Sequence, residues 1–335
     1  MTIPYIIAEI GINHNGSYEL AKKHIDVAYK CRCSAVKFQT FQLKKLLHGT
    51  VVPAEYQKIA SFASQNDMLS KCVLSKQELI GLKKYSSSLS LDFLSTAYDF
   101  DDAKLLSEIG CRSVKLASIS FVETALVEYC LSLFDYVYVS TGFTQAHELK
   151  QFSRFFSSSA SKLKIFHCIS SYPCSISDSN LHYIEDLRSL FPDIEIGFSD
   201  HCTSHIPSVL AAGMGVLLFE KHITVDRSLP GPDHGMSLDP SDLEYYVNSI
   251  RDVASLYSTK TTFRTLSNDE TLNIIPMRRT LRAYTDINIG DKLSPTNLVY
   301  TRPSSCLDQS NIRLGLTSTS FIPKGTVLNP SMFDV

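Results

Sequence analysis

The sequence predicts an α/β protein, a (β/α)₈ barrel followed by a small β-rich domain. Short apolar runs alternate with helical patterns such as ELAKKHIDVAYK (19–30), whose apolar residues recur at i, i+3, i+4 and i+7. Strands that alternate with helices are joined by crossovers and run parallel. Eight such units over about 250 residues suit a closed barrel, and an open doubly wound sheet is the alternative.

The candidate strands are apolar runs, nearly all of which end in polar residues. In chain order they are YIIAEIG (5–11), SAVKFQT (34–40), LDFLSTA (91–97), RSVKLAS (112–118), YVYVSTG (136–142), LKIFHCIS (163–170), IEIGFSDH (194–201) and GVLLFEKH (215–222). The carboxyl ends of barrel strands converge on one bowl, so these polar side chains are expected to meet there. A chance scatter would place as many polar residues at strand starts, and the observed bias favours the barrel.

The pattern changes near residue 257. STKTTFRTLSNDE (258–270) indicates a polar linker, and short β-like runs follow it at 280–287, 297–302 and 315–322. The segments TDINIGDKLSPTNLV and TSFIPKGTVLNPSMF resemble each other, which suggests internal duplication. We therefore expect three parts, which are the barrel at 1–258, a linker at 259–275 and a small domain at 276–335.

The composition of the 335-residue chain excludes several classes of protein. A net charge of −2 provides no basic field for nucleic acid or an anionic membrane. Apolar runs are too short for a transmembrane helix, and MTIPYIIAEIG lacks the features of a signal peptide. The nine cysteines are scattered and are expected to be reduced thiols, so we expect a cytoplasmic protein.

Two histidines at neighbouring strand ends suggest a metal site. Glu220 and His222 lie two residues apart in a strand and project to the same side, and His201 ends the preceding strand. Such a set suits a divalent ion of the Mn²⁺, Zn²⁺ or Fe²⁺ type with positions left for water or substrate. The alternative is a pair of hydrogen-bonded histidines at the barrel rim.

Two lysines within apolar strands suggest an anion site. Lys37 and Lys115 would be costly in a core unless they are paired or bind an anion. Hydroxyl donors at other strand ends add to them, namely Thr96, Ser118, Ser140 and Ser199. Together they suit a small phosphorylated and carboxylated molecule. A surface-facing lysine, or a Schiff base of the aldolase type, is the alternative.

Two loops complete the candidate site. GINHNGS (11–17) follows the first strand and either meets substrate hydroxyls or caps the next helix at Ser17. RSLPGPDHG (227–235) is stiffened by two prolines and either presents Asp233 and His234 inward or is only a rigid turn.

Taken in order, AEIGINHNG, AVKFQT, STG, GFSDH and EKHITVDRSLPGPDHGMSLDP resemble the N-acetylneuraminate (sialic acid) synthase family. The resemblance covers essentially the whole chain, and its segment from SDH to PGPDH is highly specific. The part from RRTLRAYTDI to the end resembles that family's antifreeze-protein-like (SAF, β-clip) domain.

The resemblance implies a transferase that condenses phosphoenolpyruvate with N-acetylmannosamine and releases phosphate. His201 and His222 would hold a divalent metal, Mn²⁺ first, with Mg²⁺ or Co²⁺ possible. Glu220, Lys37 and Lys115 would be catalytic, with Glu220 orienting the reacting water or aldehyde. The remaining positions would bind substrate: Thr96, Ser118, Ser140 and Ser199 at phosphoenolpyruvate, and Gln39, Tyr172 and Asp233 at the amino-sugar. It also implies a domain-swapped homodimer in which Arg302 contacts the sugar.

The chain departs from the family pattern on the sugar side. Asn15 stands where an acidic residue is frequent, Ser120 where a sugar-contacting carboxylate is usual and Ser170 where an asparagine is usual, while RPSS replaces Arg-Pro-Gly after Thr301. The exact sugar is therefore open, and a synthase of legionaminate, pseudaminate or a spore-coat nonulosonate is the alternative. Two further alternatives are a 3-deoxy-octulosonate or heptulosonate phosphate synthase, which lacks the C-terminal domain, and a non-catalytic carbohydrate-binding barrel.

Overall fold

The computed structural model describes residues 3–52, 64–256, 265–305 and 307–334. The chain forms two compact units, Met1–Thr259 and Lys260–Val335. The boundary predicted between residues 258 and 259 lies outside the described residues. Each unit is considered by itself below.

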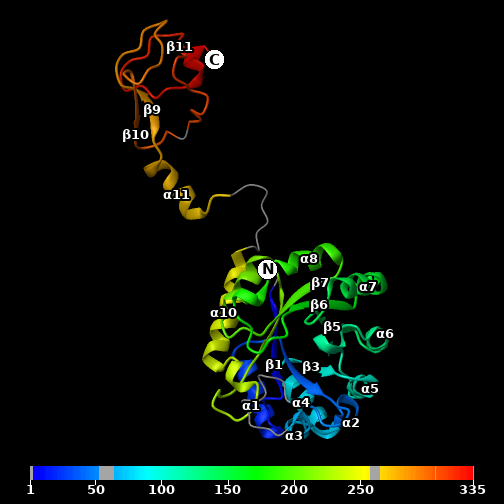
Figure 1. The fold of residues 1–335 in the computed structure, drawn as a ribbon. Coiled ribbons are helices and arrows are strands. Elements are labelled where there is room, and N and C mark those ends of the chain that lie inside the picture. Colours follow the sequence, from blue (N-terminus) through cyan, green and yellow to red (C-terminus); the bar gives the residue numbers. More distant parts are fainter. Residues whose placement is uncertain (1–2, 53–63, 257–264, 306, 335) are drawn as a thin grey trace. The chain divides into compact units, whose positions relative to one another are not determined.

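The first unit is a closed barrel. Within its described residues, eight parallel strands pair in chain order and the last pairs with the first (Figure 1). The strands are β1 (Tyr5–Gly11), β2 (Ala35–Thr40), β3 (Asp92–Ala97), β4 (Ser113–Leu116), β5 (Tyr136–Ser140), β6 (Leu163–Cys168), β7 (Glu195–Asp200) and β8 (Leu218–His222). The predicted (β/α)₈ barrel is confirmed, and the open sheet is excluded because β1 and β8 pair from Tyr5↔Leu218 to Glu9↔His222.

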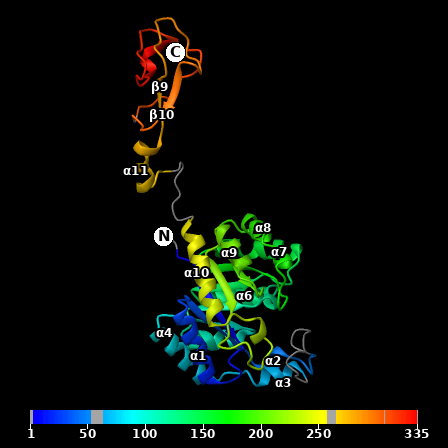
Figure 2. The same ribbon diagram turned by 90° about the vertical axis from the view of Figure 1, so that its left-hand side faces the viewer.

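Helices cover the outside of the barrel (Figures 1 and 2). They are α1 (Tyr18–Lys30), α2 (Leu43–Leu46), α3 (Gln65–Ser70), α4 (Lys76–Ser88), α5 (Phe100–Glu108), α6 (Thr124–Leu133), α7 (Ala146–Phe156), α8 (Tyr183–Leu190), α9 (Ile206–Gly213) and α10 (Pro240–Leu256). Several begin at a side-chain cap: Ser17 accepts from Leu20 N, and Ser75 and Asp99 form capping boxes. None of the helices in the described ranges is both long and apolar enough to span a membrane.

The strands carry apolar side chains on both faces. One set packs between the sheet and the helices, and includes Ile6, Val36 and Val139. A second set fills the barrel interior and consists of Ile7, Ala35, Leu94, Tyr138, Phe166 and Leu218, with Tyr5 against it. The interior is therefore a packed core, and a binding site has room only at an end of the barrel.

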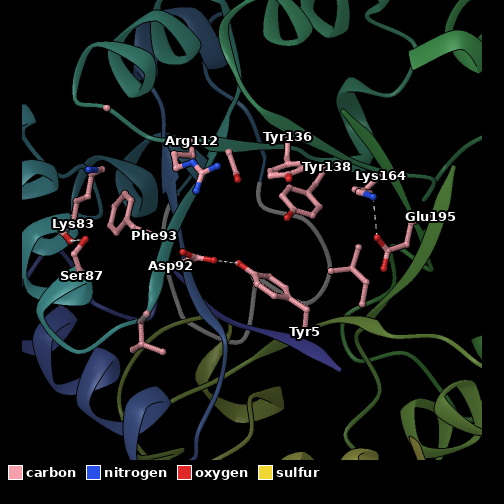
Figure 3. A pocket seen from close by; sticks show the side chains of 14 residues that line it. Tyr5, Lys83, Ser87, Asp92, Phe93, Arg112, Tyr136, Tyr138, Lys164 and Glu195 are labelled. Atoms are coloured by element: carbon pink, nitrogen blue, oxygen red, sulfur yellow. Dashed lines mark hydrogen bonds and ion pairs between the residues drawn. The ribbon is translucent and has the colours of Figure 1, made fainter. Parts of the chain in front are cut away.

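The amino end of the barrel holds a pocket of about 450 Å³ that carries structural contacts (Figure 3). The Tyr5 hydroxyl donates a hydrogen bond to Asp92 Oδ2 at 2.7 Å, which ties β1 to β3. Lys164 and Glu195 form an ion pair at 2.9 Å between β6 and β7. Since catalytic residues of such barrels lie at the carboxyl end, this amino-terminal pocket belongs to the stabilising end.

The second unit is small and contains short antiparallel strands. β9 (Thr280–Ala283) pairs with β10 (Leu298–Thr301), and β11 (Thr317–Ser318) pairs with β12 (Phe333–Asp334). The two similar half-segments meet where Ile287 and Ile322 exchange backbone hydrogen bonds of 2.9 and 2.8 Å. A small core surrounds this contact, formed by Leu281, Ala283, Ile287, Leu293, Ile322, Leu328 and Phe333.

One helix begins within the segment predicted to be a linker. α11 (Asn268–Met277) starts after Ser267, whose hydroxyl accepts from Glu270 N while the Glu270 carboxylate accepts from Ser267 N. This capping box satisfies two backbone donors that would otherwise lack partners, so the helix starts there despite its polar sequence.

Candidate functional site

The polar strand ends converge on one pocket at the carboxyl end of the barrel, as the sequence predicts. Of the candidate site residues, those that line it are Lys37, Gln39, Thr96, Lys115, Ser118, Ser140, Tyr172, Ser199, His201, Glu220 and His222. Asp233 is buried but is not part of this lining. Arg302 belongs to the second unit.

Glu220 is the centre of a buried charge network. Its Oε1 accepts from Lys115 Nζ at 3.2 Å and from Ser199 Oγ at 2.9 Å, and Lys37 Nζ lies 3.6 Å away. Lys37 also pairs with Glu9 Oε2 at 3.0 Å. All five side chains are almost fully buried. Two ammonium groups are thus held close together at the floor of the pocket.

Hydroxyl groups extend this network. Lys37 donates to Thr96 Oγ1 at 3.1 Å, and Lys115 donates to Ser140 Oγ at 2.6 Å. Lys115 Nζ also lies 4.9 Å from the centre of the Phe166 ring, at a distance typical of a cation–π contact. An anion entering here would meet two cations and several hydroxyls at fixed positions.

The two carboxyl groups differ in charge. Burial raises the pKa of Glu9 to about 7, with Glu220 adding to the rise and Lys37 opposing it. Burial acts upward on Glu220 too, but Lys115 and Lys37 outweigh it and hold its pKa at about 2. Glu220 is therefore ionised at neutral pH, whereas Glu9 is partly protonated and can take up a proton when an anion binds nearby.

His201 and His222 lie together with their ring centroids 5.5 Å apart. His201 Nδ1 lies 2.7 Å from the Ile169 carbonyl oxygen, so this nitrogen carries the proton and leaves Nε2 free to bind a ligand. Within the described chain, the buried His222 Nδ1 has no hydrogen-bond partner. Burial holds the pKa of His222 well below its usual range, which keeps the imidazole neutral as a metal ligand must be.

Two neighbouring imidazoles are ligands that suit a divalent transition-metal ion. Across the described ranges, no group of three or more His, Cys, Asp and Glu side chains is arranged to hold a metal. The two imidazoles would therefore leave the other coordination positions to water and substrate, which is the arrangement that a catalytic metal needs.

Four lining residues were not among the predicted site residues: Glu9, Tyr98, Ala117 and Cys168. Tyr98 donates to Gln39 Oε1 at 3.1 Å, and Cys168 Sγ lies 3.8 Å from His201 Nδ1. Glu9 was recognisable as a polar residue near the end of the first strand, but Cys168 gave no such signal because cysteine is common in cores.

The PGPDH loop is tied to the loop after β1. Asn15 Nδ2 donates to the Pro230 carbonyl oxygen at 2.9 Å and lies 3.2 Å from His234 Nε2. His234 Nδ1 lies 2.7 Å from Thr224 Oγ1. His234 is thus a buried anchor of the loop, and burial raises the pKa of the neighbouring Asp233 to about 6.

Ser120 and Ser170 are two further departures from the family pattern. Ser120 ends a short 3₁₀ helix (Ser118–Ser120) and is almost inaccessible. The buried Ser170 Oγ has no hydrogen-bond partner in the described chain. A Cβ at Gly142 would lie 2.0 Å from this oxygen and 2.5 Å from Ser118 Oγ, so the STG segment requires its glycine.

Several known proteins are similar to this chain. The NeuB family profile matches residues 24–262. The chain is 33% identical to the N,N'-diacetyllegionaminic acid synthase of Legionella pneumophila over 92% of this chain and 88% of that protein. It is 31% identical to the N-acetylneuraminate-9-phosphate synthase of Drosophila melanogaster over 73% of this chain and 67% of that protein.

A solved structure is similar as well. The N-acetylneuraminic acid (sialic acid) synthetase of Leptospira borgpetersenii superposes with a TM-score of 0.71 at 29% identity, over 81% of this chain and 90% of that one.

The buried histidine of α1, His24, predicts a specific acid sensitivity. Burial lowers the pKa of His24 from 6.5 to about 4, so the folded state holds this ring neutral. Its contribution to stability is present above pH 6.5 and is lost as the pH falls toward 4, roughly 2 kcal/mol by pH 5. In His24→Gln, the fall in the free energy of unfolding between pH 7 and pH 5 should be smaller than in the wild type by roughly that amount, measured by urea titration.

The matched control is His147→Gln, because His147 is exposed on α7. It should show the wild-type dependence on pH. An unchanged pH dependence in His24→Gln would contradict the prediction.

Proposed function

The chain belongs to the NeuB family, and we propose that it condenses phosphoenolpyruvate with a 2,4-diacetamido-trideoxy hexose. The product would be a nonulosonic acid of the diacetyllegionaminic type. Similar proteins of known activity, which are synthases of nonulosonate sugars, support this proposal. The observation that carries the proposal is the buried pair Lys37 and Lys115 beside Glu220 and two histidines. It offers an anion site and a metal site within one small pocket.

The proposed sugar differs from N-acetylmannosamine, which is the substrate that the family resemblance implies. Two diacetyllegionaminic acid synthases align over about nine tenths of the chain, at 33% and 30% identity. The N-acetylneuraminate-9-phosphate synthase of Drosophila melanogaster aligns over 73%. The departures at Ser120 and Ser170 lie at positions that the family resemblance places on the sugar side, which supports a substrate other than N-acetylmannosamine.

The lysines and hydroxyls would bind phosphoenolpyruvate. Its phosphate and carboxylate would bring negative charge close to Glu220, which is ionised, and to Glu9, which is partly protonated. Uptake of a proton by Glu9 would remove one negative charge from the pocket floor and so reduce the repulsion of the anion. Lys37 and Lys115 then face the anion as fixed donors, which need no reorganisation while charge develops on the leaving phosphate.

His201 and His222 would hold the divalent ion, Mn²⁺ first. When bound, such an ion polarises the aldehyde of the open-chain sugar as a Lewis acid. The Ile169 carbonyl fixes the tautomer of His201, and Gln39, Tyr98 and Tyr172 line the same pocket.

The reaction would begin with attack by carbon 3 of phosphoenolpyruvate on the sugar aldehyde. A new carbon–carbon bond forms, the aldehyde oxygen gains a proton, and carbon 2 becomes an oxocarbenium-like centre. Glu220 orients the water that adds to carbon 2 and loses a proton. The resulting intermediate expels phosphate by C–O cleavage and leaves the 2-keto group. Lys37 and Lys115 act electrostatically throughout and form no Schiff base.

The second unit would be an antifreeze-protein-like domain. Its two similar halves, joined at Ile287 and Ile322, support this proposal. By the family resemblance, it would act in a swapped homodimer, where Arg302 contacts the sugar.

The substrate panel is the direct test of the proposed function. With Mn²⁺ and phosphoenolpyruvate, phosphate release should occur with 2,4-diacetamido-trideoxy hexoses and be at least about 100-fold slower with N-acetylmannosamine or arabinose 5-phosphate, a difference of about 2.7 kcal/mol in transition-state binding. Efficient phosphate release with N-acetylmannosamine alone would contradict the proposal and show that the protein is an N-acetylneuraminate synthase. No release with any sugar would favour a non-catalytic carbohydrate-binding barrel.

Removal of either histidine tests the metal site. His201→Ala and His222→Ala should abolish Mn²⁺ binding in calorimetry and phosphate release, because one imidazole ligand is too few to retain the ion. His147→Ala is the exposed control and should bind Mn²⁺ normally. Full activity of the wild type in excess EDTA would rule out the metal.

Truncation tests the role of the second unit. A chain ending before Thr265 should lose the dimer in light scattering and release phosphate at least about 100-fold more slowly, since a sugar contact would be missing. Arg302→Ala in the full chain should keep the dimer and lose activity. A fully active truncated barrel would refute the swapped-domain proposal.

A further inference from the structure

Behind the site lies a buried ion pair that does not line the pocket. Asp200 of β7 and Lys221 of β8 are paired in register, and Lys221 Nζ lies 2.9 Å from Asp200 Oδ2. Their side chains are 0% and 1% exposed. Each precedes a histidine of the metal site. Since side chains alternate along a strand, the pair faces the helices while Glu220 and His222 face the pocket.

The pair is fully hydrogen-bonded. Asp200 Oδ1 accepts from Cys202 N at 2.8 Å, and Oδ2 accepts from Ser208 Oγ at 2.7 Å. Lys221 donates to the Cys202 carbonyl oxygen. On the helix side, Ser208 of α9 also accepts from the Tyr246 hydroxyl of α10 at 3.0 Å. Both helices, seen together in Figure 2, therefore contribute to the network.

The contacts converge on the backbone that carries His201. Asp200 holds the N–H of Cys202 and Lys221 holds its C=O, so the peptide groups that follow His201 are fixed on both sides. The His201 carbonyl oxygen also accepts from Cys174 N at 2.9 Å. His222 follows Lys221 directly. The same two charges thus determine the position of both histidine-bearing segments.

Stability alone does not account for such a pair. The cost of removing two charges from water offsets most of their attraction, and apolar residues of similar size are often at least as stabilising. The pair can instead fix the geometry of the neighbouring backbone, which matters because a metal site tolerates only about half an ångström of misplacement of its ligands.

We propose that Asp200 and Lys221 are positioning residues, which set the separation of the His201 and His222 imidazoles. The inference rests on the proposed metal site of these histidines. It assigns a role to two charged residues that touch neither the metal nor the substrate. Groups that hydrogen-bond directly to a ligating histidine change metal affinity by about 10- to 100-fold when they are removed, which sets the scale for a pair that acts on the adjoining backbone.

The test uses a charge-neutral double variant of the full chain, Asp200→Asn with Lys221→Met. The amide keeps an acceptor for Cys202 N–H, and methionine fills the space of the lysine stem. We expect Mn²⁺ to bind at least about 10-fold more weakly in titration calorimetry, with the melting temperature within a few degrees of the wild type.

The matched control is Lys164→Met with Glu195→Gln. This ion pair also joins neighbouring strands in register, but at the amino end of the barrel (Figure 3). It should leave Mn²⁺ affinity unchanged. Ser208→Ala removes one hydrogen bond to Asp200 and keeps both charges, so it should give an intermediate loss of Mn²⁺ affinity. This variant replaces the double variant in the test if the double variant does not fold.

The outcomes separate this inference from the proposed function. If the wild type binds Mn²⁺ and both the folded double variant and Ser208→Ala bind it equally well, the positioning role is overturned and the metal site stands. If the wild type binds no Mn²⁺, the metal site and the positioning role fall together. Weaker binding in both variants, with the control unchanged, supports the inference.

Discussion

The pairing of β1 with β8 is the constraint on which the site depends. Closure places Glu9 opposite His222, and the neighbouring pair β1 and β2 places Glu9 opposite Lys37. Lys37 can therefore reach Glu220 across the floor of the barrel, although the two residues lie 183 positions apart in the chain. A register slip of one residue would turn Glu220 and His222 toward the helices and remove both from the pocket.

The charge network follows from that register. Two lysines that lie together in an apolar interior would be unstable alone, and Glu220 stabilises both. A second fully charged carboxylate would cancel the remaining positive charge of the lysines, so that the site would no longer attract anions. Burial instead raises the pKa of Glu9 to about 7, so the site can lose that negative charge when an anion arrives. Burial in a region of low dielectric constant therefore has two effects. It strengthens the attraction between Glu220 and the two lysines, and it raises the pKa of Glu9 so that the site can accept an anion.

Much of the fold could be predicted from the sequence, because strand and helix periods differ and the polar residues cluster at strand ends. The eight expected runs all contain the observed strands, and the pocket gathers the expected residues of those ends. Contacts that depend on the exact register between neighbouring strands could not be predicted: the partner of Glu9 across β1 and β2, and the Asp200–Lys221 pair across β7 and β8. The start of α11 was missed although the capping box of Ser267 and Glu270 was visible in the sequence.

The departure at Asn15 has a structural explanation that bears on substrate choice. Its amide donates to the Pro230 carbonyl and lies beside His234 Nε2, and burial holds the pKa of His234 at about 4, so that ring is neutral and accepts. A carboxylate cannot donate to either group. The loss of an acidic residue here therefore stabilises the loop that carries Asp233, and discrimination between sugars falls to the other residues of the pocket wall.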